Sequence, residues 1–184
     1  MDITRRNFFR LLRAGGMDEG GEMEPMSPYK WRQLAQLLRS QHVVPLAAKG
    51  LAAYDGDPRM NIPAQLLEQL LSEAKTNEGN TFQSEPRLSN PILNRRLRNI
   101  HETEPHAIDC NTETLQLLDL IVANINHVMT QGLSLQGVLE IGHYLRSKGH
   151  RVDFVKLEGW LDRLHIARMA SLLGSILVEV FEFD

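Results

Sequence analysis

The pattern that most constrains the fold lies in residues 112–130. Large apolar residues recur there at alternating spacings of three and four, which places them on one side of an α-helix. They are Leu115, Leu118, Val122, Ile125 and Met129, and the stripe is widened by Leu117, Ile121 and Val128. A helix with so broad an apolar face needs other elements to cover it, so we expect residues 111–184 to form a helical bundle.

Three further helical segments follow, in residues 135–148, 153–164 and 166–181. Gly132 and Gly149 are typical helix stops, and Asp153 is a typical N-terminal cap. We expect the large apolar residues of segment 153–164, Phe154 among them, to lie on one side of their helix, and segment 166–181 carries a run of large apolar residues that includes Leu172. The last segment also carries small residues three or four apart, a spacing that would let another helix approach closely: Ala167, Ala170, Ser171 and Gly174.

Residues 1–80 read as an N-terminal helical arm. Residues 4–10 look like a twin-arginine export signal, but Arg13 interrupts the apolar stretch and acidic residues follow. We therefore expect a short helix that docks on the core and ends at Gly15. Residues 15–28 are rich in glycine and proline and read as a flexible loop. Helices are expected at residues 28–41 and 46–54, with a third beginning at Pro63.

The helical pattern fails between residues 76 and 91, which is the best candidate boundary in the chain. Residues 81–110 are expected to be an irregular link that contains a short basic helix at 92–100. No segment alternates with a period of two, so little or no strand is expected. The prediction is an all-α fold, a helical bundle with an N-terminal helical arm, in one compact domain overall.

Composition narrows the function classes only slightly. A hydrophobic content of 42% is that of a globular protein, and a net charge of −3 does not by itself indicate a nucleic-acid or membrane partner. Cys110 is the single cysteine, so no intrachain disulfide can form. No apolar run is long enough to span a membrane. We expect a cytoplasmic protein without a membrane partner.

Histidines and arginines supply the candidate binding residues. His127 and His143 lie on helical faces where they could line a pocket or an interface, and Glu140 precedes His143 by one helical turn. A basic cluster without acids could contact phosphates; it comprises Arg87, Arg95, Arg96 and Arg98. No aromatic residue interleaves these arginines, so stacking on bases has no support. The ordinary interpretation of the histidines is that they are hydrogen-bonded in or near the core, and that of the arginine cluster is a solvated surface.

The segment 101–110 holds six side chains that can bind metals, among them His101, Glu104, Asp109 and Cys110. Their spacing matches no common zinc pattern. No phosphate-binding glycine loop or nucleophile elbow occurs in the chain. We therefore predict no metal site and no catalytic residue.

Several stretches resemble the helical flanks of an uncharacterised bacterial nucleotidyltransferase-like family. They are residues 8–15, 31–35 and 42–46 near the N-terminus, and residues 90–97 and 132–136 with the helices around them. The resemblance implies a catalytic domain with an Asp-x-Asp motif that holds Mg²⁺ against nucleotide phosphates. No such motif stands between residues 72 and 90. Gln136 and Glu140 occupy positions where the family tends to have Arg and Asp.

The sequence therefore favours a non-catalytic helical module that binds a protein partner or associates with itself. The first alternative is a subunit or degenerate member of a nucleotidyltransferase that acts with a separate catalytic chain. Only that alternative implies Mg²⁺ and a nucleoside triphosphate; otherwise no cofactor is expected. The second alternative is weak nucleic-acid binding through the arginine cluster, although nucleic acid is the less expected partner.

Overall fold

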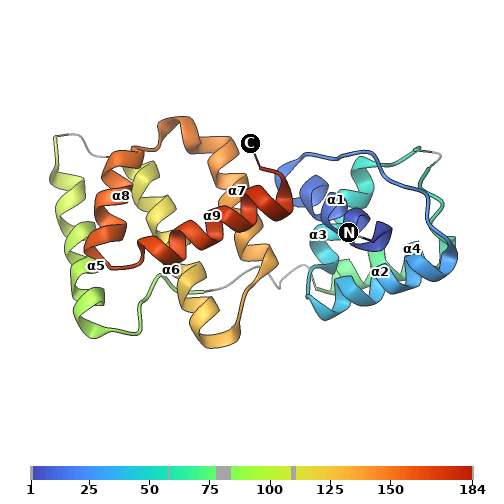
Figure 1. Ribbon diagram of the computed structural model, residues 1–184, viewed down its shortest axis with the longest axis horizontal. Helices are drawn as coiled ribbons and strands as arrows, with labels where there is room; N and C mark the ends of the chain where they lie inside the picture. The colour runs from blue at the N-terminus through green and yellow to red at the C-terminus, as the bar shows by residue number, and fades with distance from the viewer. Residues whose placement is uncertain (1, 58, 78–83, 109–110, 184) are drawn as a thin grey trace. The chain divides into compact units, whose positions relative to one another are not determined.

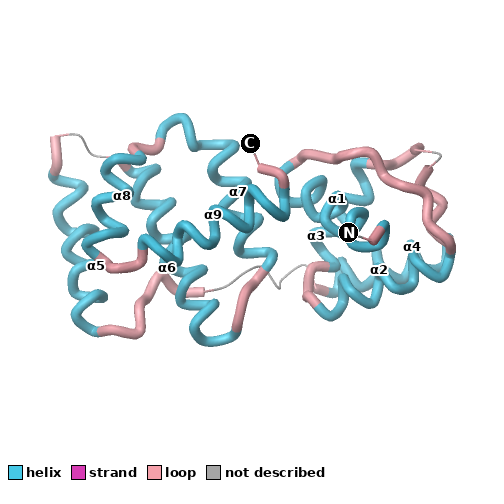
Figure 2. The backbone as a smooth tube through the Cα atoms, viewed as in Figure 1, coloured by secondary structure: helices cyan, strands magenta, loops and turns pink. Residues whose placement is uncertain are grey.

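The computed structural model describes residues 2–57, 59–77, 84–108 and 111–183. These residues contain nine α-helices, two short 3-10 helices and no strand (Figures 1 and 2), which confirms the all-α prediction. The helices group into two compact units, Met1–Phe82 (unit 1) and Gln83–Asp184 (unit 2). No helix among the described residues has the length and apolar content needed to cross a membrane.

Unit 1 contains four helices: α1 (Ile3–Met17), α2 (Pro28–Ser40), α3 (Val44–Ala53) and α4 (Ala64–Thr76). The side chains of Asp2 and Ser27 cap α1 and α2 by accepting hydrogen bonds from backbone N–H groups in the first turn. The unit has its own buried core, whose largest fully buried side chains are Leu11, Leu12, Met23, Trp31, Leu34, Leu38 and Leu70.

Two glycines let α1 and α3 touch through their backbones. A Cβ atom added at Gly15 would lie 1.9 Å from the carbonyl oxygen of Leu46, and one added at Gly50 would lie 2.1 Å from that of Leu11. The prediction that Gly15 ends the first helix is wrong, since α1 continues to Met17. Gly15 is there because α3 approaches too closely for any side chain.

The segment between α1 and α2 is not helical, yet it is held firmly against unit 1. Asn7 is fully buried and pairs with the backbone of Glu24, accepting from its N–H and donating to its C=O. Asn61 forms the same two bonds with the backbone of Met26, and the Tyr54 hydroxyl donates to the carbonyl of Gly21. The segment is a loop, as the composition predicts, and polar side chains satisfy part of its backbone.

Unit 2 contains the other five helices: α5 (Pro91–Thr103), α6 (Thr112–Gln131), α7 (Leu135–Lys148), α8 (Phe154–Arg163) and α9 (Ala167–Phe181). The predicted cap at Asp153 is present, since its side chain accepts a hydrogen bond from the first turn of α8, and the predicted stop at Gly132 ends α6 with φ of +99°. Asn111 caps the first turn of α6 in the same way. Helix α6 contacts α7, α8 and α9. Its broad apolar face therefore meets the helices that the pattern required.

The short connections of unit 2 are tied to its helices by buried polar groups. The Lys156 ammonium donates to the buried Glu104 carboxylate at 2.8 Å, and this pair joins α8 to the 3-10 helix η1 (Glu104–His106). Thr114 of α6 accepts a hydrogen bond from the backbone N–H of Asp153 at 2.9 Å. These contacts fix where α8 begins and so position one wall of the groove described next.

Candidate functional site

An apolar cavity of about 270 Å³ lies between α6, α7, α8 and α9. Its floor is formed by Leu117 and Ile121 of α6, and its walls by apolar side chains of the other three helices. The small residues of α9 that the sequence singled out also line it: Ala167, Ala170, Ser171 and Gly174. A Cβ atom added at Gly174 would meet nothing within 4 Å, so this part of the cavity is open.

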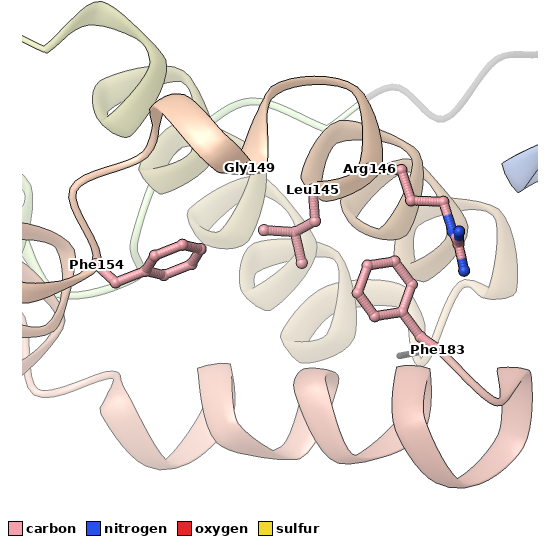
Figure 3. Close-up of a pocket in the computed structure, with 5 residues that line it drawn as sticks. All are labelled: Leu145, Arg146, Gly149, Phe154 and Phe183. Carbon is pink, nitrogen blue, oxygen red and sulfur yellow. The ribbon is translucent and has the colours of Figure 1, made fainter.

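A second hollow, of about 580 Å³, adjoins the first and shares Leu145 and Phe154 with it. Figure 3 shows the Leu145 side chain between Phe154 and Phe183 above α9. The Arg146 guanidinium lies 5.0 Å from the centre of the Phe183 ring, a cation–π contact. The two hollows together form one apolar groove along α9, called the α9 groove below.

Large apolar side chains stand exposed beside the α9 groove. Phe154 and Val155, at the start of α8, are 54% and 83% exposed, and Val178 of α9 is 56% exposed. Leu172 is 50% exposed, but it lies on the side of α9 opposite to the residues that line the groove. Phe154 and Leu172 belong to strongly apolar segments of the sequence, yet each is at least half exposed. Exposed apolar surface next to a concave apolar surface is typical of protein-binding sites.

The charges at the α9 groove are few and lie at its edges. Glu158 and Asp162 of α8 line the cavity at one side, and Arg146 of α7 lies beside the second hollow. The groove therefore offers shape and apolar area with a sparse charged rim. Nothing in this lining resembles a nucleophile with its base or a set of metal ligands.

The four candidate pocket residues on α6 and α7 do not line the α9 groove. His127, Gln136 and Glu140 are half-buried and His143 is exposed. The amide nitrogen of Gln136 donates to the Glu140 carboxylate at 3.4 Å, a contact along one face of α7. Their role as a pocket or interface stays a prediction.

The four arginines of the basic cluster are all exposed, and one of them has a structural partner. Arg96 donates to the carbonyl of Arg163 at 2.8 Å and lies 3.1 Å from the Nε2 atom of His165. It thereby ties α5 to the turn between α8 and α9. Arg95 and Arg98 share α5 with Arg96, whereas Arg87 precedes the helix.

The structure brings together one titratable pair that the sequence did not reveal. His101 Nε2 of α5 lies 2.7 Å from Asp119 Oδ1 of α6, and burial raises the pKa of Asp119 while His101 opposes that rise. The eighteen-residue separation gives no sequence signal for this contact. Both side chains are about one-third exposed, so the pair is best explained as a tie between two helices.

The described residues contain no group of three or more His, Cys, Asp or Glu side chains that could hold a metal ion. Among the residues of segment 101–110, Asp109 and Cys110 lie outside the described residues. Glu104 is engaged by Lys156 and His101 by Asp119. These two side chains therefore serve contacts between helices.

The α9 groove itself could be anticipated only in part. The small residues of α9 gave a signal, because their spacing marks a helix face that permits close approach. The sequence does not show that Phe154, Val155 and Val178 are exposed, because the same apolar residue can be buried or exposed in a helix.

Comparison of the chain with protein-family models, with curated proteins and with solved structures found no match.

Proposed function

We propose that the chain is a non-catalytic helical module that binds protein, either another chain or a second copy of itself, through the α9 groove. The observation that carries this proposal is the open groove flanked by three large apolar side chains that are more than half exposed, Phe154, Val155 and Val178. Leaving such side chains in water forfeits the free energy that their burial would contribute, about 25 cal/mol per Å². A protein surface that fills the groove would recover part of it.

Filling the groove with a side chain of the protein's own tests this proposal. Leucine at position 174 would project from α9 into space where nothing lies within 4 Å of the new Cβ atom. The variant should fold, because leucine is also the better helix former, by somewhat under 1 kcal/mol. Gly159→Leu is the matched control, since Gly159 lies on α8, meets nothing within 4 Å and does not line the groove.

The experiment immobilises the full chain, offers it a cell extract to which purified free chain has been added, and quantifies what is retained. We expect the wild type and Gly159→Leu to retain the same protein, and Gly174→Leu to retain at least about tenfold less of it. Equal retention by all three, or retention of nothing by the wild type, would show that the groove is not a protein-binding site.

The nucleotidyltransferase resemblance supplies an independent test of the non-catalytic part of the proposal. A subunit of such an enzyme that still binds nucleotide would show Mg²⁺-dependent affinity for ATP or GTP. Isothermal titration of the full chain should show no heat of binding at nucleotide concentrations up to about 1 mM, where weak complexes are populated. Micromolar affinity that disappears on removal of Mg²⁺ would overturn the proposal.

A further inference from the structure

The first cavity of the α9 groove is lined by two carboxylates and, among the described residues, by no basic side chain. The carboxylates belong to Glu158 and Asp162 of α8, and the other lining residues are uncharged. Both acids are exposed, and neither forms an ion pair or a side-chain hydrogen bond within the described ranges. The α8 side of the groove is therefore negatively charged.

These two acids stand where the free chain does not favour them. Glu158 and Asp162 are four residues apart and so lie on one face of α8, where like charges repel each other. Asp162 is also in the last turn of α8, which ends at Arg163, and the helix dipole disfavours an anion there. A positive charge supplied from outside the chain would relieve both effects.

The α9 wall of the groove has the length and the small side chains that suit a partner helix. It runs from Ala167 to Leu177, which is about 15 Å or three helical turns. Ala170, Ser171 and Gly174 lie between these two residues, and their short side chains allow another helix to approach closely. Over this length an amphipathic helix presents apolar side chains at positions i, i+3 or i+4, and i+7. Such a stripe matches the apolar lining of the cavity.

The basic helices of this chain already use their own apolar faces. Helix α1 carries four arginines and no acid, and α5 carries three arginines. The apolar face of α1 is buried at Phe8, Leu11 and Leu12, and that of α5 is buried at Leu97 and Ile100. Neither helix can enter a groove on a second copy without exposing these side chains, so the occupant is expected from another protein.

We propose that the α9 groove binds a basic amphipathic helix of another protein. The apolar stripe of that helix fills the cavity, and lysines or arginines beside the stripe pair with Glu158 and Asp162. This inference rests on the proposed function and specifies the chemistry of its partner. Because both carboxylates are exposed, they contribute more to the choice of partner than to the affinity, which comes from the apolar contact.

Two synthetic peptides of about 18 residues, long enough to form a helix on binding, serve as probes. Both carry leucines at i, i+4, i+7 and i+11 in an alanine background. The basic peptide has lysines on either side of this stripe, and the acidic peptide has glutamates at the same positions. Fluorescence anisotropy of each labelled peptide, titrated with the full chain, should give a Kd on the order of 10–100 µM for the basic peptide. The acidic peptide should bind at least about tenfold more weakly, and the difference should shrink in high salt.

Reversal of the two carboxylates should invert this preference. Glu158→Lys/Asp162→Lys presents like charges to the basic peptide, so the acidic peptide should now bind about tenfold more tightly than the basic one. The matched control is Glu102→Lys/Glu179→Lys, which changes the net charge by the same amount at two exposed acids that do not line the groove. It should keep the wild-type preference.

Gly174→Leu shows whether the peptide occupies the groove, and it should weaken binding of the basic peptide at least about tenfold. The inference is overturned if the wild type binds the two peptides equally, or binds neither at chain concentrations up to about 200 µM. A preference that survives the reversal of Glu158 and Asp162, or binding that Gly174→Leu leaves unchanged, would also overturn it. So would a dimer in sedimentation equilibrium that Gly174→Leu dissociates, because the occupant would then be a second copy.

The retention experiment separates the failure of this inference from that of the proposed function. If Gly174→Leu loses the retained protein while Glu158→Lys/Asp162→Lys keeps as much as the wild type, the groove binds protein but its partner is not a basic helix. In that case the proposed function stands and the inference is wrong. If the wild type retains no protein and binds neither peptide, both are wrong.

Discussion

Two helical glycines in each unit of the chain show opposite surroundings. In unit 1, Gly15 and Gly50 face the backbone of a neighbouring helix so closely that an added Cβ atom would lie about 2 Å from a carbonyl oxygen. In unit 2, Gly159 and Gly174 lie on helices where an added Cβ atom would meet nothing within 4 Å. Gly15 and Gly50 thus permit close packing in unit 1, whereas Gly159 and Gly174 leave surface open in unit 2.

Exposed apolar side chains show the same difference. Among the described residues, the large apolar side chains that stand exposed in unit 1 are Tyr29 and Leu71, whereas unit 2 exposes eight, three of them beside the α9 groove. Unit 1 also uses buried or half-buried polar side chains to hold the connection between α1 and α2 in place. Unit 2 therefore leaves more large apolar side chains exposed than unit 1 does, which is the difference on which the proposed binding role depends.

The largest effect on the contrast between the two units is expected at the contact between α1 and α3. Gly15→Ala forces a methyl group against the Leu46 carbonyl, so α1 and α3 must separate, at a cost of about 3 kcal/mol or more. Hydrogen exchange of the full chain, read by mass spectrometry on peptides from each unit, should show a loss of protection throughout unit 1.

Gly174→Ala is the matched change in unit 2 and should have the opposite sign. Alanine there meets no neighbour and improves helix propensity, so α9 should be stabilised by about 0.5–1 kcal/mol. Unfolding of the two variants in urea gives the comparison directly. Equal destabilisation by both would mean that the two glycines do not differ as the packing indicates.

A smaller loss is expected when the connection between α1 and α2 loses its anchor. Asn7→Ala removes both hydrogen bonds to the Glu24 backbone and leaves an N–H and a C=O without their protein partner, which costs about 2 kcal/mol. Asn77→Ala, at the exposed end of α4, is the control and should change stability by less than about 0.5 kcal/mol. If Asn7→Ala also proved nearly neutral, the connection would be an appendage of unit 1 rather than part of its core.

Helical periodicity predicted most of the helices of the fold, and the positions where it failed have physical explanations. The pattern of residues 112–130 places the buried residues of α6 on one face, yet Met129 is 67% exposed because it lies in the last turn of the helix. Periodicity reports which residues share a face and not how far the covering helices extend. The prediction for Gly15 failed for a related reason. A glycine that ends a helix and a glycine that allows a neighbouring helix to pack closely cannot be distinguished from the sequence.

The candidate site was harder to predict than the fold, because a groove depends on the space between helices. The small residues of α9 predict a face that another helix could approach closely. Their spacing does not show whether a helix of the same unit covers that face or leaves it open. The contact between His101 and Asp119 likewise joins two helices, and the sequence pattern does not reveal how these helices are rotated relative to each other. His127, His143 and Glu140 were candidate pocket residues because their side chains can bind or titrate. The α9 groove is lined mainly by apolar side chains, which carry no such signal in the sequence.

The smallest expected effect concerns the acid stability of unit 1. Hydrogen bonds from Arg6, with a further one from Arg10, lower the pKa of Glu24 from its ordinary value to about 2. A carboxyl group whose pKa is lower in the folded state stabilises that state above its unfolded pKa, and this stabilisation is lost as the pH falls. The contribution of Glu24 should therefore be complete near pH 5 and disappear between about pH 4.5 and pH 2.

Glu24→Gln removes this titration and should flatten the pH dependence of unit 1 protection in that window. Partial exposure of the three side chains screens the contacts, so the change should be modest and should shrink further in high salt. Glu22→Gln, two residues away and 86% exposed, is the control expected to keep the wild-type profile. Because Glu24 belongs to unit 1 alone, the protection of unit 2 peptides should follow the same pH course in all three proteins. A shift in unit 2 would show that the two units do not maintain their stability separately.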